Sequence, residues 1–197
     1  EICRYQKRRF GLDYCYDKEC IVTVGGSEAI DLAFRAIINP GDEVILLQPS
    51  YVAYTPGVAL AGGKVVNIEL KEDNEFKLTP ELLEAAITPK TKAILLNYPS
   101  NPTGGFMTRE DYEKIVSIIK KHEIIVITDE IYAELSYEQK FCSIAAFDEI
   151  KDQVILVSGY SKAYAMTGWR LGYVLANEVL TKAMNKIHQY VDRKSVV

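Results

Sequence analysis

Lys162 is the residue of this chain best suited to covalent chemistry. It follows the apolar run Val154–Val157 and the tripeptide Gly159-Tyr160-Ser161, and the next residues, Ala163-Tyr164-Ala165-Met166, offer few partners for a surface ammonium. A lysine after a serine is by default a solvated surface charge. In a partly desolvated pocket, however, the neutral amine is favoured, and only the neutral amine attacks a carbonyl. We therefore expect Lys162 to be a nucleophile in such a pocket.

Two nearby features could bind an anion. Arg170 lies in Gly168-Trp169-Arg170-Leu171-Gly172, and its guanidinium can grip a phosphate or carboxylate with two hydrogen bonds. The run Val24-Gly25-Gly26-Ser27-Glu28 leads from a short expected strand into a helix. Glycines let the backbone approach closely, and the free N–H groups of a helix start favour an anion. Alone, this second motif is weak, because two glycines before a serine commonly mark only a turn.

Acidic, amide and aromatic side chains follow other apolar runs. Asp129-Glu130 follows Ile124–Thr128, the turn 97–105 follows Ala93–Leu96, and Tyr51 lies shortly after an earlier run. Each could have a purely structural role: Asp129 could cap a helix, residues 97–105 could serve only to reverse the chain, and Tyr51 could pack in the core. Their shared position at the ends of apolar runs favours a functional role.

Alternating strands and helices must position these residues. Short runs rich in β-branched residues predict strands buried on both faces, and amphipathic runs predict helices between them. The expected strands are Val44–Leu47, Val65–Ile68, Ala93–Leu96, Ile124–Thr128 and Val154–Val157, and the expected helices are Ser27–Ile38, Val52–Ala61, Pro80–Ile87 and Arg109–Lys121, with further helical patterns over 1–10 and 178–190. This alternation indicates one α/β domain with a mostly parallel sheet and helices on both faces. In such a sheet, ligands bind beyond the carboxyl ends of the strands, where the residues above lie.

Several expected helices begin with a plausible capping residue. Ser27 precedes an apolar-periodic run, and Thr79 precedes Pro80, a favoured first helical residue. Thr108 is followed three positions later by Asp111, where a full capping box would have Glu or Gln.

Composition excludes several classes of function. The net charge of −4 argues against a nucleic-acid partner. No run approaches the roughly 20 apolar residues of a membrane span, and no signal-peptide pattern opens the chain. The four cysteines (Cys3, Cys15, Cys20 and Cys142) have no CxxC spacing, so we expect no metal site and no disulfide framework. Reduced thiols in a cytoplasmic protein are the expected state.

Three motifs together resemble a known family. The stretch Gly159–Gly172 is similar at every position to the pyridoxal-5′-phosphate (PLP) attachment signature of the class I/II aminotransferases, and residues 97–104 and 129–132 resemble two further blocks of that family, in the right order. The likeness extends from about Arg9 to Tyr190. It implies an aspartate-aminotransferase-like, fold type I large domain, a three-layer α/β sandwich around a mostly parallel sheet of about seven strands.

The resemblance also implies a role for the reactive residues. Lys162 would form the Schiff base with PLP and later move a proton as acid and base. Asp129 would hold the protonated pyridine nitrogen, which makes the ring an electron sink. Asn101 and Tyr132 would hydrogen-bond the cofactor's 3′-oxygen. Glu130 has no assigned role.

The remaining implied contacts hold the ring and the phosphate. Tyr51 would stack on one face of the pyridine ring and Ile131 would close the other. Gly26, Ser27, Ser161 and Arg170, which we call the phosphate cup, would bind the phosphate. Where relatives often carry a serine, three positions before the lysine, this chain has Gly159, so one family hydroxyl is absent.

The resemblance implies an aminotransferase that moves an amino group between an amino acid and a 2-oxo acid, in amino-acid metabolism, as a homodimer. Two alternatives stay open. A PLP-dependent β-lyase or synthase of the same fold would share Lys162, Asp129 and Arg170, although the Asn-Pro-Thr-Gly and Met-Thr-Gly-Trp-Arg blocks favour an aminotransferase. A PLP-binding regulatory module would carry a DNA-binding extension.

The resemblance covers mainly one domain. Residues 1–197 are interpreted as a single large PLP-binding domain, a fragment that lacks the family's N-terminal arm and C-terminal small domain, with the arginine that grips the substrate carboxylate. We expect the fragment to fold and to be able to bind PLP, but not to catalyse transamination alone. Residues 191–197 do not resemble the family's continuation. From relatives, we also expect cis bonds at Gln48-Pro49 and Asn101-Pro102.

Overall fold

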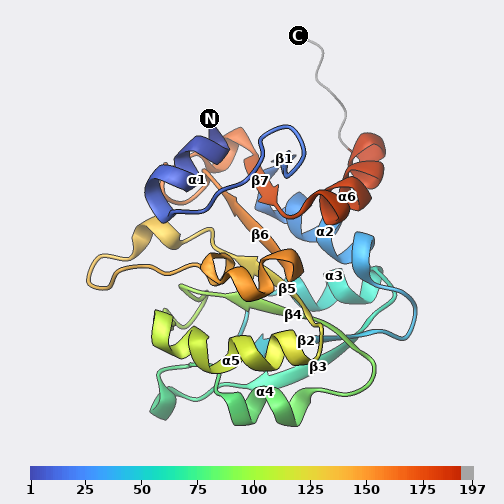
Figure 1. Ribbon diagram of the computed structural model, residues 1–197, viewed down its shortest axis with the longest axis vertical. Helices are drawn as coiled ribbons and strands as arrows, with labels where there is room; N and C mark the ends of the chain where they lie inside the picture. Colours follow the sequence, from blue (N-terminus) through green and yellow to red (C-terminus); the bar gives the residue numbers. More distant parts are fainter. Residues whose placement is uncertain (192–197) are drawn as a thin grey trace.

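A seven-stranded sheet forms the middle layer of the computed structural model, which describes residues 1–191. The strand order is β1-β7-β6-β5-β4-β2-β3 (Figure 1). The strands are β1 (Cys20–Val24), β2 (Glu43–Gln48), β3 (Lys64–Glu69), β4 (Thr91–Asn97), β5 (Ile125–Asp129), β6 (Val154–Gly159) and β7 (Leu171–Leu175). Strands β3, β2, β4, β5 and β6 pair in parallel, whereas β7 is antiparallel to both β6 and β1. The expected α/β fold with a mostly parallel sheet is confirmed. The atypical tail lies outside the described residues, except for Val191.

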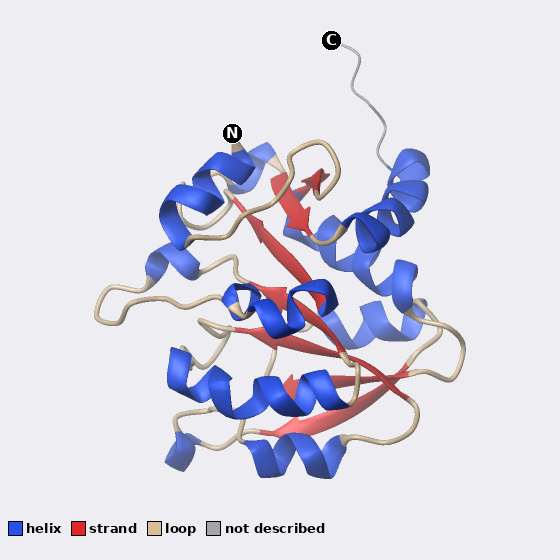
Figure 2. Ribbon diagram, viewed as in Figure 1, coloured by secondary structure: helices blue, strands red, loops and turns tan. Residues whose placement is uncertain are grey.

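Helices cover both faces of the sheet (Figure 2). The α-helices are α1 (Ile2–Phe10), α2 (Gly25–Ile37), α3 (Tyr54–Leu60), α4 (Pro80–Ala86), α5 (Arg109–Lys121) and α6 (Glu178–Val191), and the short 3-10 helices are η1 (Glu72–Asn74), η2 (Ala133–Leu135), η3 (Ile144–Ala146), η4 (Asp148–Gln153) and η5 (Thr167–Trp169). Apolar residues of α1, α4 and α5 pack into one core, and those of α2, α3 and α6 pack into a second. Within residues 1–191, no helix combines the length and apolar character that a membrane crossing requires.

Two of the three capping residues predicted from the sequence cap a helix in the structure. Thr79 accepts a hydrogen bond from the Leu82 amide, with Pro80 as the first helical residue. Thr108 and Asp111 form a reciprocal capping box, so aspartate substitutes for the usual glutamate. The expectation for Ser27 is wrong. Helix α2 begins two residues earlier, at Gly25, which places Ser27 inside the first turn, and Val24 is the N-cap.

Strand β7 is absent from the strands expected from apolar runs. It begins inside the motif around Arg170 and contains Gly172, which interrupts the apolar pattern. Its antiparallel pairing with β1 and β6 brings the start of β7 to the same edge of the sheet as the end of β1 and the end of β6. Arg170, directly before β7, therefore reaches the edge where the other candidate residues lie.

Gly172 packs against the first turn of α2. A Cβ added at Gly172 would lie 2.4 Å from the carbonyl carbon of Gly25 and 2.5 Å from the amide nitrogen of Gly26. Both are backbone atoms, so they cannot move aside as a flexible side chain would. Only glycine allows β7 and the start of α2 to approach this closely.

We predict that Gly172→Ala lowers the free energy of unfolding by about 1–3 kcal/mol or more, because the extra methyl must displace backbone. Gly168→Ala is the matched control, since a Cβ there meets nothing within 4 Å. Urea unfolding of the two variants beside the wild type measures the difference. Equal stabilities for the two alanine variants would contradict the packing described.

Glu130 is a buried carboxyl group in the core next to β5. Its Oε1 accepts hydrogen bonds from Ser143 Oγ at 2.6 Å and from Thr128 Oγ1 at 3.1 Å. Burial raises the pKa of Glu130 from its ordinary 4.5 to about 8, although both hydroxyl donors act in the opposite direction. The negative charge of neighbouring Asp129 raises the pKa further. Glu130 is therefore protonated in the folded chain at neutral pH.

This raised pKa gives a pH-dependent stability. The folded state holds the proton more tightly than the unfolded state, so the stabilisation is fully present below about pH 4.5 and is lost as the pH rises through about 8. We predict that Glu130→Gln, which stays uncharged, removes this loss. Chemical unfolding from pH 5 to 9 should show the stability of the wild type falling relative to that of the variant. Parallel curves for the two proteins would refute the assignment.

Candidate active site

One cavity of about 240 Å³ lies at the carboxyl edge of the sheet. Its volume is close to the lower end of small-ligand pockets, roughly 300 Å³. All ten residues that the sequence nominates line it, together with four that it does not. The ten are Gly26, Ser27, Tyr51, Asn101, Asp129, Ile131, Tyr132, Ser161, Lys162 and Arg170, and the four are Ile30, Tyr54, Asn97 and Thr167. The crossovers between parallel strands bring these distant segments to one edge.

Asp129 is the buried acid of the cavity. It ends β5 and is 6% exposed. Its Oδ2 accepts a hydrogen bond from Tyr54 Oη at 2.8 Å, and its Oδ1 accepts one from the Ile131 amide at 3.1 Å. Burial raises the pKa of Asp129, while the two donors and the positive charge of Lys162 oppose the rise. A cationic group bound in the cavity would oppose it further.

Tyr54 is a site residue that the sequence analysis missed. It is 1% exposed at the start of α3, and its ring contacts that of Tyr51 edge-on at 5.5 Å between centroids. Burial and the Asp129 carboxylate raise the pKa of Tyr54 well above its ordinary value, so the phenol remains a donor. The available signal was its place three residues after Tyr51 near a helix start, which puts both rings on one side of the chain.

Asn97 was also missed, because the sequence analysis placed it in the turn 97–105 and gave it no role of its own. Its Nδ2 donates to the Asp129 carbonyl at 2.9 Å, and its Oδ1 accepts from the Asn101 amide at 2.9 Å. Asn97 thus ties the turn that carries Asn101 to the end of β5.

The bonds before Pro49 and Pro102 are cis, as expected, and the bond between Tyr98 and Pro99 is cis as well.

Lys162 lies in the turn between β6 and η5. Its Nζ is 5.7 Å from the centroid of the Tyr132 ring, which follows β5. The side chain of Lys162 is exposed, so the expected partial desolvation is not found in the described chain. Residues 164–165 and the stretch from Thr167 to Arg170 are exposed as well, so this side of the cavity is open.

The phosphate cup lies where α2 begins. Gly26 and Ser27 are in the first turn of α2, whose free amides and positive dipole end favour an anion. The Arg170 guanidinium packs against Gly25, because a Cβ there would lie 2.4 Å from Arg170 Nη2. Arg170 Nη1 also donates to the Thr167 carbonyl at 3.2 Å. These residues and Ser161 gather positive charge and donors on one part of the wall.

The cavity therefore combines three chemistries. The phosphate cup can bind an anionic group, Asp129 can bind a protonated nitrogen, and the Lys162 amine can reach a carbonyl carbon between them. Tyr51 and Ile131 supply apolar walls. The arrangement suits a flat, polar ligand with an anionic group and a basic ring nitrogen. Among the described residues, no cluster of His, Cys, Asp and Glu could hold a metal ion.

Comparison with known proteins is consistent with this geometry. The model of the family "Aminotransferase class I and II" matches residues 1–191. The chain is 53% identical over 190 residues to "Putative aminotransferase YugH" of Bacillus subtilis (strain 168), and 42% identical over 189 residues to aspartate aminotransferase of Geobacillus stearothermophilus. These alignments cover 96% and 95% of this chain but 49% and 48% of the relatives. The chain thus spans about half the length of the curated relatives it matches.

Solved aminotransferase structures also match this chain over about half of their own length. Aromatic aminotransferase from Pyrococcus horikoshii OT3 superposes with a TM-score of 0.93 at 37% identity, over 96% of this chain and 51% of that protein. Aspartate aminotransferase from Thermus thermophilus with maleate superposes with a TM-score of 0.91 at 39% identity, over 96% of this chain and 49% of that protein.

Proposed function

The chain belongs to the class I and II aminotransferase family, and on that premise we propose that it is the PLP-binding domain of an aminotransferase with Lys162 as the attachment residue. The family is PLP-dependent. The observation that carries the proposal is that all ten residues nominated by the attachment signature and its companion motifs line a single cavity.

The residues present fit PLP in charge and in donor type. A phosphate needs donors and positive charge, which the phosphate cup supplies at the start of α2. A pyridine nitrogen stays protonated beside a carboxylate, and Asp129 is a buried carboxyl group with one oxygen held by Tyr54. The cofactor aldehyde needs an amine, and Lys162 lines the same cavity.

When bound, PLP supplies an electron sink that stabilises the carbanion formed at the substrate α-carbon. The Lys162 amine would anchor the cofactor and would hold and return the proton that leaves the substrate α-carbon. Asp129 would keep the ring nitrogen protonated. The hydroxyl of Tyr132 and the amide of Asn101 would donate to the ring oxygen, while Tyr51 and Ile131 would hold the ring from either face.

The proposal for the whole protein extends beyond residues 1–197. Its substrates would be an amino acid and a 2-oxo acid, and it would act as a homodimer. Lys162 is exposed in residues 1–191, which supports the proposal that further protein covers the cavity in the whole enzyme. Transamination also needs groups that hold the substrate in a fixed orientation, which can be worth roughly 7–11 kcal/mol. We therefore propose that residues 1–197 alone bind PLP without efficient transamination.

We predict that PLP added to the chain, followed by borohydride, labels Lys162. The reason is that, among residues 1–191, Lys162 is the lysine that lines the cavity with the phosphate cup and Asp129. Peptide mapping by mass spectrometry locates the label. Lys162→Ala should lose it, whereas Lys120→Ala, on the exposed face of α5, should keep it. Label spread evenly over surface lysines in all three proteins would sink the proposal.

A second prediction concerns Asp129 in the full-length enzyme. Asp129→Ala should retain PLP through Lys162 and the phosphate cup, yet slow exchange of the substrate α-proton by several orders of magnitude, because the protonated ring acts mainly in the transition state. Deuterium exchange followed by NMR measures the rate, and Asp129→Asn separates loss of charge from loss of shape. Near-normal exchange in both variants would remove Asp129 from the role.

A further inference from the structure

Two side chains of α1 converge on Glu134. The Arg9 guanidinium donates to both carboxylate oxygens. Its Nε lies 2.9 Å from Oε1 and 3.1 Å from Oε2, and its Nη2 lies 2.9 Å from Oε2. Tyr5 Oη donates a hydrogen bond to Oε1 of the same group. Tyr5 and Arg9 are four residues apart, so they lie on one face of the helix. We call Tyr5, Arg9 and Glu134 the latch.

Glu134 of the latch lies in the turn that carries Tyr132. Glu134 lies in η2, two residues after Tyr132. Within this turn, the Ala133 amide donates to the Glu130 carbonyl at 3.0 Å and the Leu135 amide to the Tyr132 carbonyl at 2.9 Å. Among residues 1–191, the Tyr132 hydroxyl has no hydrogen-bond partner of its own. Its placement therefore depends on how the turn is held.

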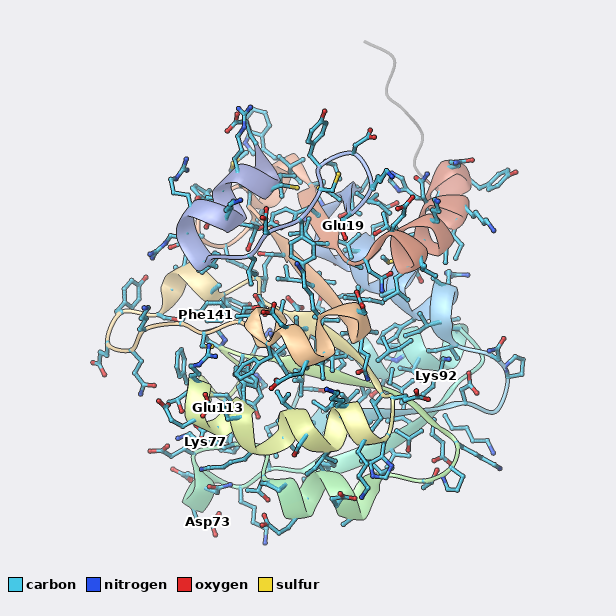
Figure 3. All side chains as sticks on the ribbon, viewed as in Figure 1. Glu19, Asp73, Lys77, Lys92, Glu113 and Phe141 are labelled. Carbon is cyan, nitrogen blue, oxygen red and sulfur yellow. The ribbon has the colours of Figure 1, made fainter. Side chains whose placement is uncertain are left out.

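On its far side, the turn leads into an exposed loop. Residues 137–140 are exposed, and the loop returns through Phe141, labelled in Figure 3, whose ring contacts that of Phe10 at 5.4 Å between centroids. Strand β5 fixes one end of the turn. At the other end, α1 supplies the contacts, through Phe10 on the loop and through the latch on Glu134.

Helix α1 is itself attached to the sheet. Gln6, 2% exposed, donates from Nε2 to the Tyr173 hydroxyl in β7 at 2.7 Å, and Cys3 is buried in the core. A nine-residue helix is too short to be stable alone, so these contacts hold it in place. The latch thus connects the Tyr132 turn to a helix anchored on the sheet.

The same face of α1 approaches the Lys162 turn. A small cavity of about 10 Å³, lined by Tyr5, Glu134, Ala163 and Tyr164 among others, separates α1 from the turns after β5 and β6. Burial, followed by the neighbouring Glu134 and Tyr164 side chains, raises the pKa of Tyr5. The latch therefore lies beside the two turns that carry Tyr132 and Lys162, both of which line the active-site cavity.

An ordinary surface ion pair would not deserve a functional role, because such pairs contribute little to stability. This pair differs in two respects. The Arg9 guanidinium donates to both carboxylate oxygens. The Glu134 side chain is only 22% exposed and also accepts a hydrogen bond from the Tyr5 hydroxyl. The pKa of Glu134 is lowered, first by the Arg9 hydrogen bond, so the carboxylate is charged at neutral pH.

We propose that Tyr5 and Arg9 are positioning residues that hold Glu134, and through it Tyr132, at the distance from Lys162 that the cofactor requires. This inference rests on the proposed function, since it assumes that Tyr132 donates to the 3′-oxygen of PLP. Such a donor draws electron density from that oxygen and weakens its hold on the proton of the Schiff base. Displacing Tyr132 should therefore raise the pH at which that proton dissociates.

The test is an absorbance titration of the PLP-loaded chain. Tyr132→Phe sets the scale, with an upward shift of the midpoint. Arg9→Ala and Tyr5→Phe are expected to shift the midpoint in the same direction, by about half a unit or more. Arg8→Ala, which removes the same charge from an exposed site on the same helix, should leave it unchanged. Combining Arg9→Ala with Tyr132→Phe should add nothing to the shift of Tyr132→Phe alone.

A charge swap guards against simple unfolding. The double variant Arg9→Glu with Glu134→Arg should restore the midpoint toward that of the wild type, and thermal unfolding checks that each variant is folded. If Tyr132→Phe shifts the midpoint but folded Arg9→Ala and Tyr5→Phe match Arg8→Ala, the latch is overturned while the proposed function stands. If PLP gives the wild type no titrating band, the proposed function fails instead.

Discussion

The buried carboxyl group of Asp129 is the constraint on which the rest of the site depends. Burial of an unpaired carboxylate costs several kcal/mol, so a carboxylate retained at the end of a central strand needs partners. Tyr54 and the Ile131 amide each bind one oxygen, and the charge of Lys162 opposes the rise in its pKa. These partners compensate in part, because the pKa of Asp129 is still raised. We propose that a protonated ring nitrogen completes the compensation.

The sheet explains why such distant residues meet. Parallel strands β2, β4, β5 and β6 end at one edge, and antiparallel β7 begins there. A carboxyl group from β5, an amide from the turn after β4 and a lysine from the turn after β6 therefore share one cavity. Gly172 lets β7 press against the start of α2, which brings Arg170 to the amides of the phosphate cup.

The sequence predicted what depends on local pattern. Helix α5 has the expected bounds, because its capping residues and amphipathic period lie within the segment itself. Strand β7 was missed because Gly172 interrupts its apolar pattern. Glycine is required there, since β7 packs directly against the backbone of α2. The hydrogen bonds of Tyr54 and Asn97 to Asp129 could not be predicted, because no spacing along the chain reveals a partner more than thirty residues away. Ser27 looked like a cap, but α2 starts at Gly25, whose positive φ only glycine adopts readily.

A crystal structure of the chain grown with PLP tests the central claim most directly, because it locates each part of the cofactor against the residues that are proposed to bind it. The account predicts continuous density from Lys162 Nζ to the cofactor, with the phosphate at the start of α2 beside Arg170 and the ring nitrogen within hydrogen-bond distance of Asp129. Density for the cofactor at another surface, or with its phosphate next to Asp129, would contradict it.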